Sequence, residues 1–229
     1  MLLGSESEPH QATAPRSPRL RVLIAEDHQL VLEGIRKIIE SECQIVGTTG
    51  NGRDLLSLVD ELKPDLLLLD IALPLLNGIE AARQLHRTHP GLKIIFVTMQ
   101  LSRDYVRAAF EAGASGYVLK QAAAADLVNA LREVKGGRYF VSSAISDKYL
   151  PHAPSPNQNP SKLFGSLTPR QREVLQLVAE GKSAKEIGNL LFISVKTVEF
   201  HKKHLMEELD LRSTAELIRY AVEHGWVSS

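Results

Sequence analysis

Short runs of apolar residues alternate with amphipathic segments between residues 20 and 140. The clearest runs are residues 22–25, 66–69 and 94–97. Continuous apolar runs bounded by polar residues are typical of strands buried on both faces of a sheet. Between them, a spacing such as that of Val31, Ile35 and Ile38 places apolar side chains on one face of a helix. Strand and helix alternate five times, which predicts an α/β fold with a doubly wound, five-stranded parallel sheet.

The four leucines at 66–69 leave a second interpretation open, because periodicity alone fits a buried helix equally well. Pro64 stands shortly before this run and Pro74 shortly after it. Because the residue before a proline avoids the helical conformation, a short strand is the better prediction here.

The composition changes after residue 140. Residues 151–160 carry four prolines and no apolar periodicity, so we predict a linker over 141–165. Residues 1–19 carry three prolines and almost no apolar periodicity, and we predict a disordered lead there. The predicted sheet domain is therefore limited to residues 20–140.

Residues 166–229 have helical patterns throughout. Thr168, Ser183 and Ser213 are each followed three positions later by Gln or Glu, which is the signature of a capped helix start. We predict a small all-α domain of four short helices, with Trp226 buried against the last of them. The residues 182–191, a break at 192–194 and a second helix from 195 to 209 have the form of a helix-turn-helix.

The overall charge does not point to any partner. Lys and Arg together number 27, as do Asp and Glu, so the formal net charge is zero. Cys43 is the single cysteine, which excludes an internal disulfide and fits a reducing cytoplasm. The chain lacks the pattern of a signal peptide, and no apolar run approaches the roughly 18 residues of a membrane helix. We therefore expect a soluble cytoplasmic protein without membrane contact.

Chemically active residues follow the predicted strands. Glu26 and Asp27 follow the first strand, Asp70 the third, Thr98 ends the fourth and Lys120 follows the fifth. The carboxyl ends of parallel strands meet at one edge of the sheet, where ligands bind. Three carboxylates repel one another there unless a cation such as Mg²⁺ is bound. A carboxylate can attack phosphorus, while an ammonium and a hydroxyl can hold phosphoryl oxygens.

Four segments resemble the receiver domain of response regulators over about residues 20–138. They are 22–27 with its acidic pair, 70–74 followed by Asn77-Gly78, 97–98, and 113–120, which is especially similar to the NarL/FixJ family. The resemblance implies that Asp70 is the phosphoacceptor of a cognate histidine kinase. It implies a Mg²⁺ site of Glu26, Asp27, Asp70 and the Ala72 carbonyl, a switch pair of Thr98 and Tyr117, and Lys120 as the phosphate clamp.

Two positions depart from the receiver pattern. The acidic pair is Glu-Asp rather than Asp-Asp, and Leu73 stands where many members carry Met. Phosphatases of the haloacid-dehalogenase class also use an Asp nucleophile with Mg²⁺, but they need a second Asp two residues later. Ala72 occupies that position here, so we do not expect an enzyme.

The second helix of the predicted helix-turn-helix presents polar residues and Phe200 on one side. Residues 166–229 contain nine basic and nine acidic residues, so spaced ion pairs on a solvated face remain an alternative to DNA binding. The segments 167–175, 183–188 and 194–201 nevertheless resemble the LuxR-type helix-turn-helix. That resemblance implies phosphate contacts from Lys196, Thr197 and His201, and base contacts near Glu199, Phe200 and Lys203.

The two resemblances together predict a two-component response regulator. Phosphorylation of Asp70 would control sequence-specific binding to double-stranded DNA, as a homodimer, and thereby transcription. The resemblance also suggests residues 213–223 as a pairing surface, and a resting receiver that covers the recognition helix. The alternatives are a phosphotransfer module whose C-terminal helices bind protein, and an Asp-based phosphatase.

Overall fold

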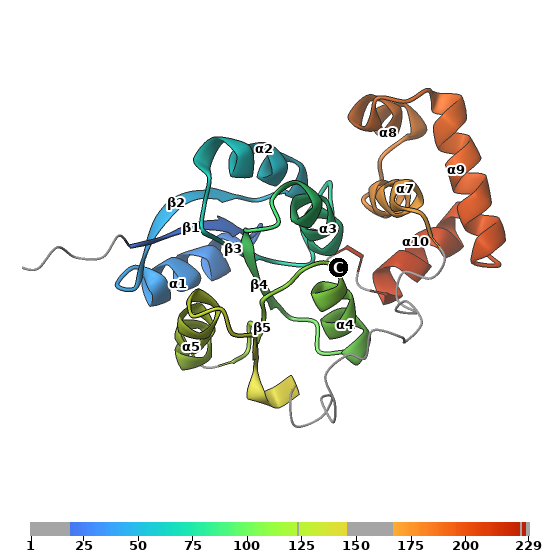
Figure 1. Cartoon of the computed structure of the whole chain (residues 1–229). Helices are drawn as coiled ribbons and strands as arrows, with labels where there is room; N and C mark the ends of the chain where they lie inside the picture. The colour runs from blue at the N-terminus through green and yellow to red at the C-terminus, as the bar shows by residue number, and fades with distance from the viewer. Residues whose placement is uncertain (1–18, 123, 146–166, 225, 228–229) are drawn as a thin grey trace, which may run out of the picture.

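The computed structural model describes residues 19–122, 124–145, 167–224 and 226–227, and it places a sheet flanked by helices beside a group of helices (Figure 1). The strands are β1 Leu20–Ala25, β2 Cys43–Thr49, β3 Leu66–Leu69, β4 Lys93–Thr98, β5 Gly116–Leu119 and β6 Phe140–Val141. The receiver helices are α1 Gln29–Ile39, α2 Gly52–Leu62, α3 Gly78–Thr88, α4 Arg103–Glu111 and α5 Ala124–Lys135. The C-terminal helices are α7 Pro169–Ala179, α8 Ala184–Leu191, α9 Val195–Glu208 and α10 Thr214–Glu223.

The sheet is parallel and doubly wound, as predicted. Its strand order is β2-β1-β3-β4-β5-β6, and every paired strand runs parallel to its neighbour. The chain moves outward from β1 to β2 and then crosses back to β3 on the other side of β1. This reversal opens a crevice at the carboxyl ends of β1 and β3, which is where such sheets bind ligands.

The leucine run at 66–69 is a strand that contributes to two cores. Leu66 and Leu68 pack with α1 and α5, whereas Leu67 and Leu69 pack with α2, α3 and α4. Successive side chains of a strand point to opposite faces of the sheet. All four leucines are buried because helices cover both faces. Figure 1 shows α1 and α5 on one side of the sheet and the other three helices on the opposite side.

The sixth strand was not predicted. Residues Phe140–Val141 pair with β5, and Ser142 and Ile145 are fully buried. Residues 141–145 therefore belong to the receiver rather than to the linker that we expected to begin there. A two-residue strand is too short to leave a periodic signal. The rest of the expected linker, and residues 1–18 of the expected lead, lie outside the described residues.

The C-terminal helices begin at the residues that the capping signals indicate. Thr168 and Ser183 each form a complete capping box, with Gln171 and Glu186 as partners. At the third site only half of the box forms, because the Glu216 carboxylate accepts from the Arg212 N–H instead. Trp226 is buried, as predicted. Within the described part of the chain, no helix is both long and apolar enough to cross a membrane.

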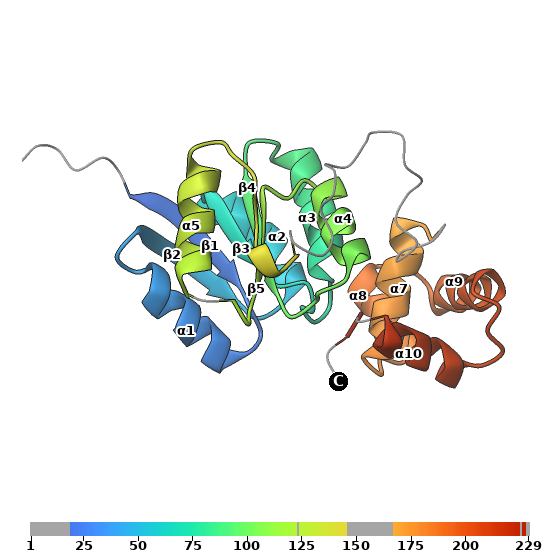
Figure 2. The same cartoon turned by 90° about the horizontal axis from the view of Figure 1, so that it is seen from below.

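The C-terminal domain contacts the receiver through α7 and the end of α10. Arg172 of α7 forms a partly buried ion pair with Glu80 of α3 at 2.9 Å, and the Tyr105 hydroxyl of α4 donates a hydrogen bond to the His224 carbonyl. Both views place α9 on the far side of α7 from the receiver (Figures 1 and 2). In this arrangement the receiver therefore leaves α9 uncovered, whereas the resemblance suggests a resting state in which the receiver covers it.

Candidate functional site

The pairing of β1 with β3 brings two carboxylates to the same edge. Ala25 is opposite Leu69 in the strand register, so Glu26 and Asp70 follow at adjacent positions. The Asp70 N–H donates to the Ala25 carbonyl at 2.9 Å, which holds the two chain segments together. Both acidic residues are only 3% exposed. Burial of unpaired carboxylates is costly, so this edge requires a cationic partner.

Lys120 is that partner. Its Nζ lies 2.8 Å from Asp70 Oδ2 and 2.8 Å from Glu26 Oε2. The backbone N–H of Lys120 donates to the Thr98 carbonyl at 2.9 Å, which fixes where the side chain starts. Burial alone would lower the pKa of Lys120, but the neighbouring Asp70 and Glu26 outweigh this and raise it. Burial and the Asp70 charge raise the pKa of Glu26, although its hydrogen bond with Lys120 opposes them.

Asp27 and His28 complete an acidic cluster with Glu26 and Asp70. One side-chain ligand atom from each of the four residues lies within 4.8 Å of the others. His28 Nδ1 is 2.8 Å from Asp27 Oδ1 and 3.3 Å from Glu26 Oε1. Sequence reasoning missed His28, although its place directly after the acidic pair was a usable signal. Clustered carboxylate oxygens are the donors that Mg²⁺ prefers, so the residues present fit this ion.

The loop after Asp70 is closely packed against the site. Ala72 lines the same crevice as Asp27. A Cβ atom on Gly78 would lie 2.0 Å from the Asp70 carbonyl oxygen, so only glycine fits at the start of α3. Gly78 of the Asn77-Gly78 pair thus allows the start of α3 to pack directly against the backbone of Asp70.

Thr98 and Tyr117 are both buried and both bind the segment after β4. The Thr98 hydroxyl accepts from the Gln100 N–H at 3.3 Å, and the Tyr117 hydroxyl donates to the Gln100 carbonyl at 2.9 Å. Burial raises the pKa of Tyr117 well above its usual value, so the phenol is protonated. The two side chains are therefore connected through Gln100.

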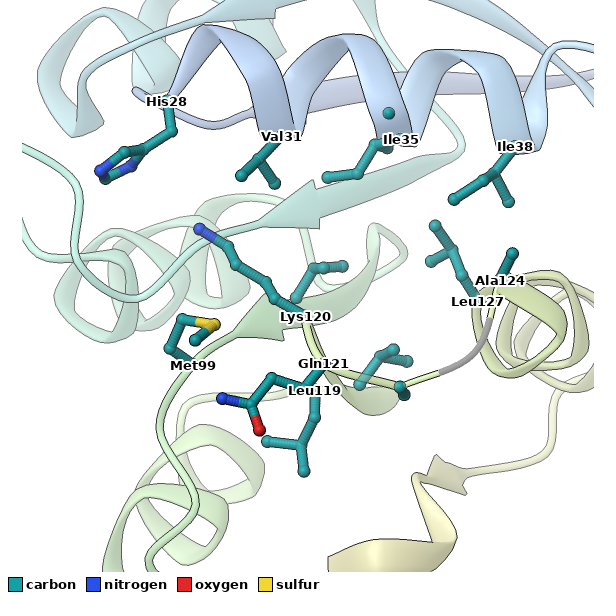
Figure 3. A pocket seen from close by; sticks show the side chains of 14 residues that line it. His28, Val31, Ile35, Ile38, Met99, Leu119, Lys120, Gln121, Ala124 and Leu127 are labelled. Carbon is teal, nitrogen blue, oxygen red and sulfur yellow. The ribbon is translucent and has the colours of Figure 1, made fainter.

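An apolar groove of about 460 Å³ lies beside the acidic site, between α1 and the segment from β5 to α5. Figure 3 shows His28 and Lys120 at one end of this groove and Ile38 with Leu127 at the other. The groove therefore joins an apolar surface to the ionic centre.

The proposed DNA-binding residues lie along one side of α9. Ser194 caps this helix by accepting from the Thr197 N–H at 3.1 Å. Four of the six are exposed and two, Thr197 and His201, are half-buried. The exposed residues are Lys196, Glu199, Phe200 and Lys203. Burial and nearby Arg170 lower the pKa of His201.

Ion pairs between residues of α9 are present, as the alternative of a solvated charged face predicts. Lys202 lies 3.7 Å from Glu199, and Lys203 lies 3.7 Å from Glu207. Phe200 is 58% exposed, and its ring centroid lies 4.4 Å from that of His204. An exposed aromatic ring beside lysines is not explained by the packing of the domain.

Comparison with known proteins identifies both domains. The response regulator receiver domain family matches residues 22–132, and the luxR family of bacterial regulatory proteins matches residues 165–221. The chain is 35% identical to the transcriptional regulatory protein MctR of Rhizobium johnstonii, over 92% of this chain and 97% of the relative. It is 35% identical to the transcriptional regulatory protein LiaR of Bacillus subtilis, over 88% and 96% of the two chains.

Solved structures agree with these matches. RcsB from Salmonella typhimurium is 30% identical with a TM-score of 0.64, and the match covers 91% of this chain and 99% of RcsB. RcsB from Salmonella enterica bound to the promoter rprA, in the presence of phosphomimetic BeF₃⁻, is 32% identical with a TM-score of 0.54, covering 88% and 97%.

This chain therefore belongs to the two-component response regulators of the NarL/FixJ type, which join a receiver to a LuxR-type DNA-binding domain. The family comprises transcription regulators rather than enzymes, which excludes the Asp-based phosphatase.

Proposed function

We propose that Asp70 accepts a phosphoryl group from a histidine kinase and that this reaction controls DNA binding by α9. The Asp70 carboxylate attacks the phosphorus of a phosphohistidine, the P–N bond breaks, and the imidazole leaves while an acyl phosphate forms on Asp70. The observation that carries the proposal is the ion pair of Lys120 with both Asp70 and Glu26 at 2.8 Å. An ammonium in this place can move to the phosphoryl oxygens once they arrive.

Glu26, Asp27, Asp70 and the Ala72 carbonyl would hold the Mg²⁺ ion. When bound, the ion supplies positive charge that offsets the repulsion between the carboxylates and an incoming phosphate. The clustering of the three carboxylates supports this assignment, because their oxygens converge where the phosphoryl group would arrive. Lys120 would remain the clamp that binds the phosphoryl oxygens.

Thr98 and Tyr117 would transmit the phosphorylation of Asp70 to the segment that follows β4. A phosphoryl oxygen near the end of β4 would accept a hydrogen bond from the Thr98 hydroxyl, and rotation of this side chain toward the phosphoryl group would weaken the hydrogen bond that the hydroxyl now accepts from the Gln100 N–H. Because the Tyr117 hydroxyl is bound to the carbonyl of the same Gln100, movement of this segment alters the position of the phenol. The switch would therefore use a segment with two alternative arrangements.

The output would be double-stranded DNA bound by a homodimer. Lys196, Thr197 and His201 would contact phosphates, and Glu199, Phe200 and Lys203 would lie near base edges in the major groove. The exposure of Phe200 next to the lysines supports this assignment. The RcsB structures include dimers bound to DNA, which supports pairing on two half-sites. We also propose that this protein acts in the cytoplasm, where a kinase and a promoter are both accessible.

The kinase would approach along α1. Leu30 of α1 is 88% exposed, and the apolar groove with Lys120 at its end lies next to this helix. An apolar surface that leads to the nucleophile suits a protein phosphodonor that must place its phosphohistidine at Asp70.

The test compares wild type with Asp70→Asn, using acetyl phosphate and Mg²⁺ and detecting the acyl phosphate by mass. We expect labelling of the wild type, none of the variant, and none after chelation of the metal. Asp65→Asn is the matched control, because Asp65 is exposed at the opposite end of β3. Equal labelling of Asp70→Asn would contradict the proposal. Footprinting on promoter DNA then separates DNA binding from binding of a protein partner.

A further inference from the structure

A histidine ring lies against the carboxylates of the acidic site. His28 directly follows Glu26 and Asp27, and its Nδ1 lies 2.8 Å from Asp27 Oδ1 and 3.3 Å from Glu26 Oε1. One ligand atom from each of these three residues and from Asp70 lies within 4.8 Å of the others. Mg²⁺ is bound through oxygen ligands, so the imidazole is a donor that this ion does not require.

The start of α1 does not explain the direction of the His28 side chain. His28 is the N-cap residue of α1, but its side chain makes no capping hydrogen bond. At the same position of α2, α3 and α4, the side chains of Asn51, Asn77 and Ser102 each accept from a backbone N–H of the helix. Short polar side chains of this kind are the usual N-caps. The imidazole of His28 contacts the two carboxylates instead.

Apolar packing does not hold the ring in place either. The side chain of His28 is 54% exposed, whereas that of Glu26 is 1% exposed. Figure 3 shows the ring at the end of the apolar groove where the Lys120 ammonium also lies. The polar contacts with Asp27 and Glu26 therefore determine where the ring lies, and its exposed side leaves a path from solvent to the carboxylates.

The distances suit neighbouring ligands of one ion. Two ligand atoms at right angles, each about 2.1 Å from an octahedral ion, lie about 3 Å apart. The separations of His28 Nδ1 from Asp27 Oδ1 and from Glu26 Oε1 fall on either side of this value. The imidazole nitrogen therefore already lies where a further ligand of a cation held by Asp27 and Glu26 would lie.

We propose that His28 is a direct ligand of the divalent cation at the acidic site, and that its imidazole makes the site favour first-row transition-metal ions over Mg²⁺. This inference rests on the metal site of the proposed function. Without the ion, an Nδ1–H donates to the Asp27 carboxylate. When an ion binds, Nδ1 gives its lone pair to the metal and the proton passes to solvent.

The chemistry of the donors gives the order of the effect. Imidazole is a common ligand of transition metals, whereas Mg²⁺ favours carboxylate, carbonyl and water oxygens. Affinity for a given set of nitrogen and oxygen ligands rises from Mn²⁺ to Co²⁺. The contribution of His28 to affinity should therefore be largest for Co²⁺, smaller for Mn²⁺ and absent for Mg²⁺.

The experiment compares the full chain, free of any affinity tag, with His28→Gln, which keeps a polar side chain and removes the imidazole. Calorimetric titrations with Mg²⁺, Mn²⁺ and Co²⁺ measure the three affinities. Loss of a residue that only orients a ligand already weakens metal binding about 10- to 100-fold, so His28→Gln should weaken Co²⁺ binding at least about tenfold. Mg²⁺ binding should change by less than about twofold, because its oxygen ligands remain.

His89→Gln is the matched control. His89 Nε2 lies 3.1 Å from Asp60 Oδ1, so this variant also removes an imidazole beside a carboxylate. His89 lines a separate crevice with Leu20 and Lys93, where β1 and β4 begin. The three affinities of His89→Gln should equal those of the wild type.

Pulsed electron paramagnetic resonance of bound Mn²⁺ provides a second readout. A coordinated imidazole couples its nitrogen to the unpaired electrons of the ion. Wild type and His89→Gln should show this coupling, and His28→Gln should lack it. A histidine that only positions Asp27 would give no nitrogen coupling, and its removal would weaken the binding of all three ions by the same factor.

The outcomes separate the two proposals. If wild type binds none of the three ions, or if Asp70→Asn is phosphorylated as well as wild type, the proposed function fails. If wild type binds Mg²⁺ but shows no nitrogen coupling, or if His28→Gln weakens all three ions equally, the ligand role of His28 fails and the proposed function stands. Should His28→Gln not fold, His28→Asn replaces it, since asparagine caps α2 and α3. The ratio of Co²⁺ to Mg²⁺ affinity then decides.

Discussion

The acidic site of the receiver and the outer face of α9 differ in whether the side chains find their interaction partners within the protein. At the acidic site, Asp70 and Glu26 are buried and Lys120 binds both across the ends of three strands. On α9, Phe200, Lys196 and Lys203 are exposed, and the ion pairs connect residues of the same helix. The first site is preorganised by the sheet, whereas the second depends on a partner to give its residues their contacts.

This difference explains why the charged residues indicate a function at the acidic site but not on α9. Buried charges must be compensated within the fold, so the arrangement of Lys120 and the carboxylates follows from energetics. Exposed charges are compensated by water at little cost, so a neutral face is compatible both with DNA and with solvent. The comparison can be tested at either site.

The largest effect is expected from Lys120→Met. Removal of the ammonium leaves Glu26 and Asp70 buried without a cation, and breaking such a pair costs about 3 kcal/mol of unfolding free energy. Burial and Asp70 raise the pKa of Glu26, so protonation relieves the repulsion and the deficit should shrink as the pH falls below neutrality. Urea unfolding at several pH values, with and without Mg²⁺, measures this.

Mg²⁺ should recover part of the stability that Lys120→Met loses, and it should bind the variant more tightly than wild type, because no ammonium competes for the carboxylates. Lys37→Met, at an exposed position of α1, controls for the loss of a positive charge. Weaker Mg²⁺ binding by Lys120→Met would contradict the view that Lys120 occupies the site in place of a cation.

A pair of substitutions in α9 should separate packing from recognition. Leu205 is fully buried, and Leu205→Ala should cost about 2 kcal/mol of unfolding free energy, the lower end of the usual range because a small domain can relax. Phe200→Ala should change stability by less than about 0.5 kcal/mol, because the ring is exposed. Thermal unfolding and operator binding are measured on both variants. Loss of DNA affinity in Phe200→Ala without loss of stability is expected, and a large loss of stability would show that Phe200 packs locally.

The sheet and the acidic site could be predicted because the first, third and fourth strands have strong local signals at 22–25, 66–69 and 94–97. The leucine run at 66–69 is confirmed as a strand, and strand order brings Glu26, Asp70 and Lys120 to one edge by topology alone. The short β6 could not be predicted, since two residues carry no period. His28 was not predicted as a member of the cluster, because its position at the start of α1 accounts for it equally well.

The contacts between the domains could not be predicted from the sequence. Gln176 stands at a position of α7 that helical periodicity assigns to no special role, and its partners Leu73 and Asn77 lie about a hundred residues earlier. Those partners are backbone groups, which any residue offers. An interaction of this kind has no sequence signature, and only the three-dimensional arrangement of the two domains reveals it.

The smallest predicted effect concerns the salt dependence of DNA binding. Lys196 is exposed in the first turn of α9, where a recognition helix meets the DNA backbone. If Lys196 neutralises one phosphate, Lys196→Ala should reduce the slope of log K against log salt by about 1 and weaken binding to every sequence similarly. Lys37→Ala on the receiver should leave the slope unchanged. Titrations of one operator and one unrelated duplex at several salt concentrations measure both quantities. If Lys196→Ala keeps the slope and loses only operator preference, Lys196 contacts a base edge, and the division of α9 between phosphate and base contacts must be redrawn.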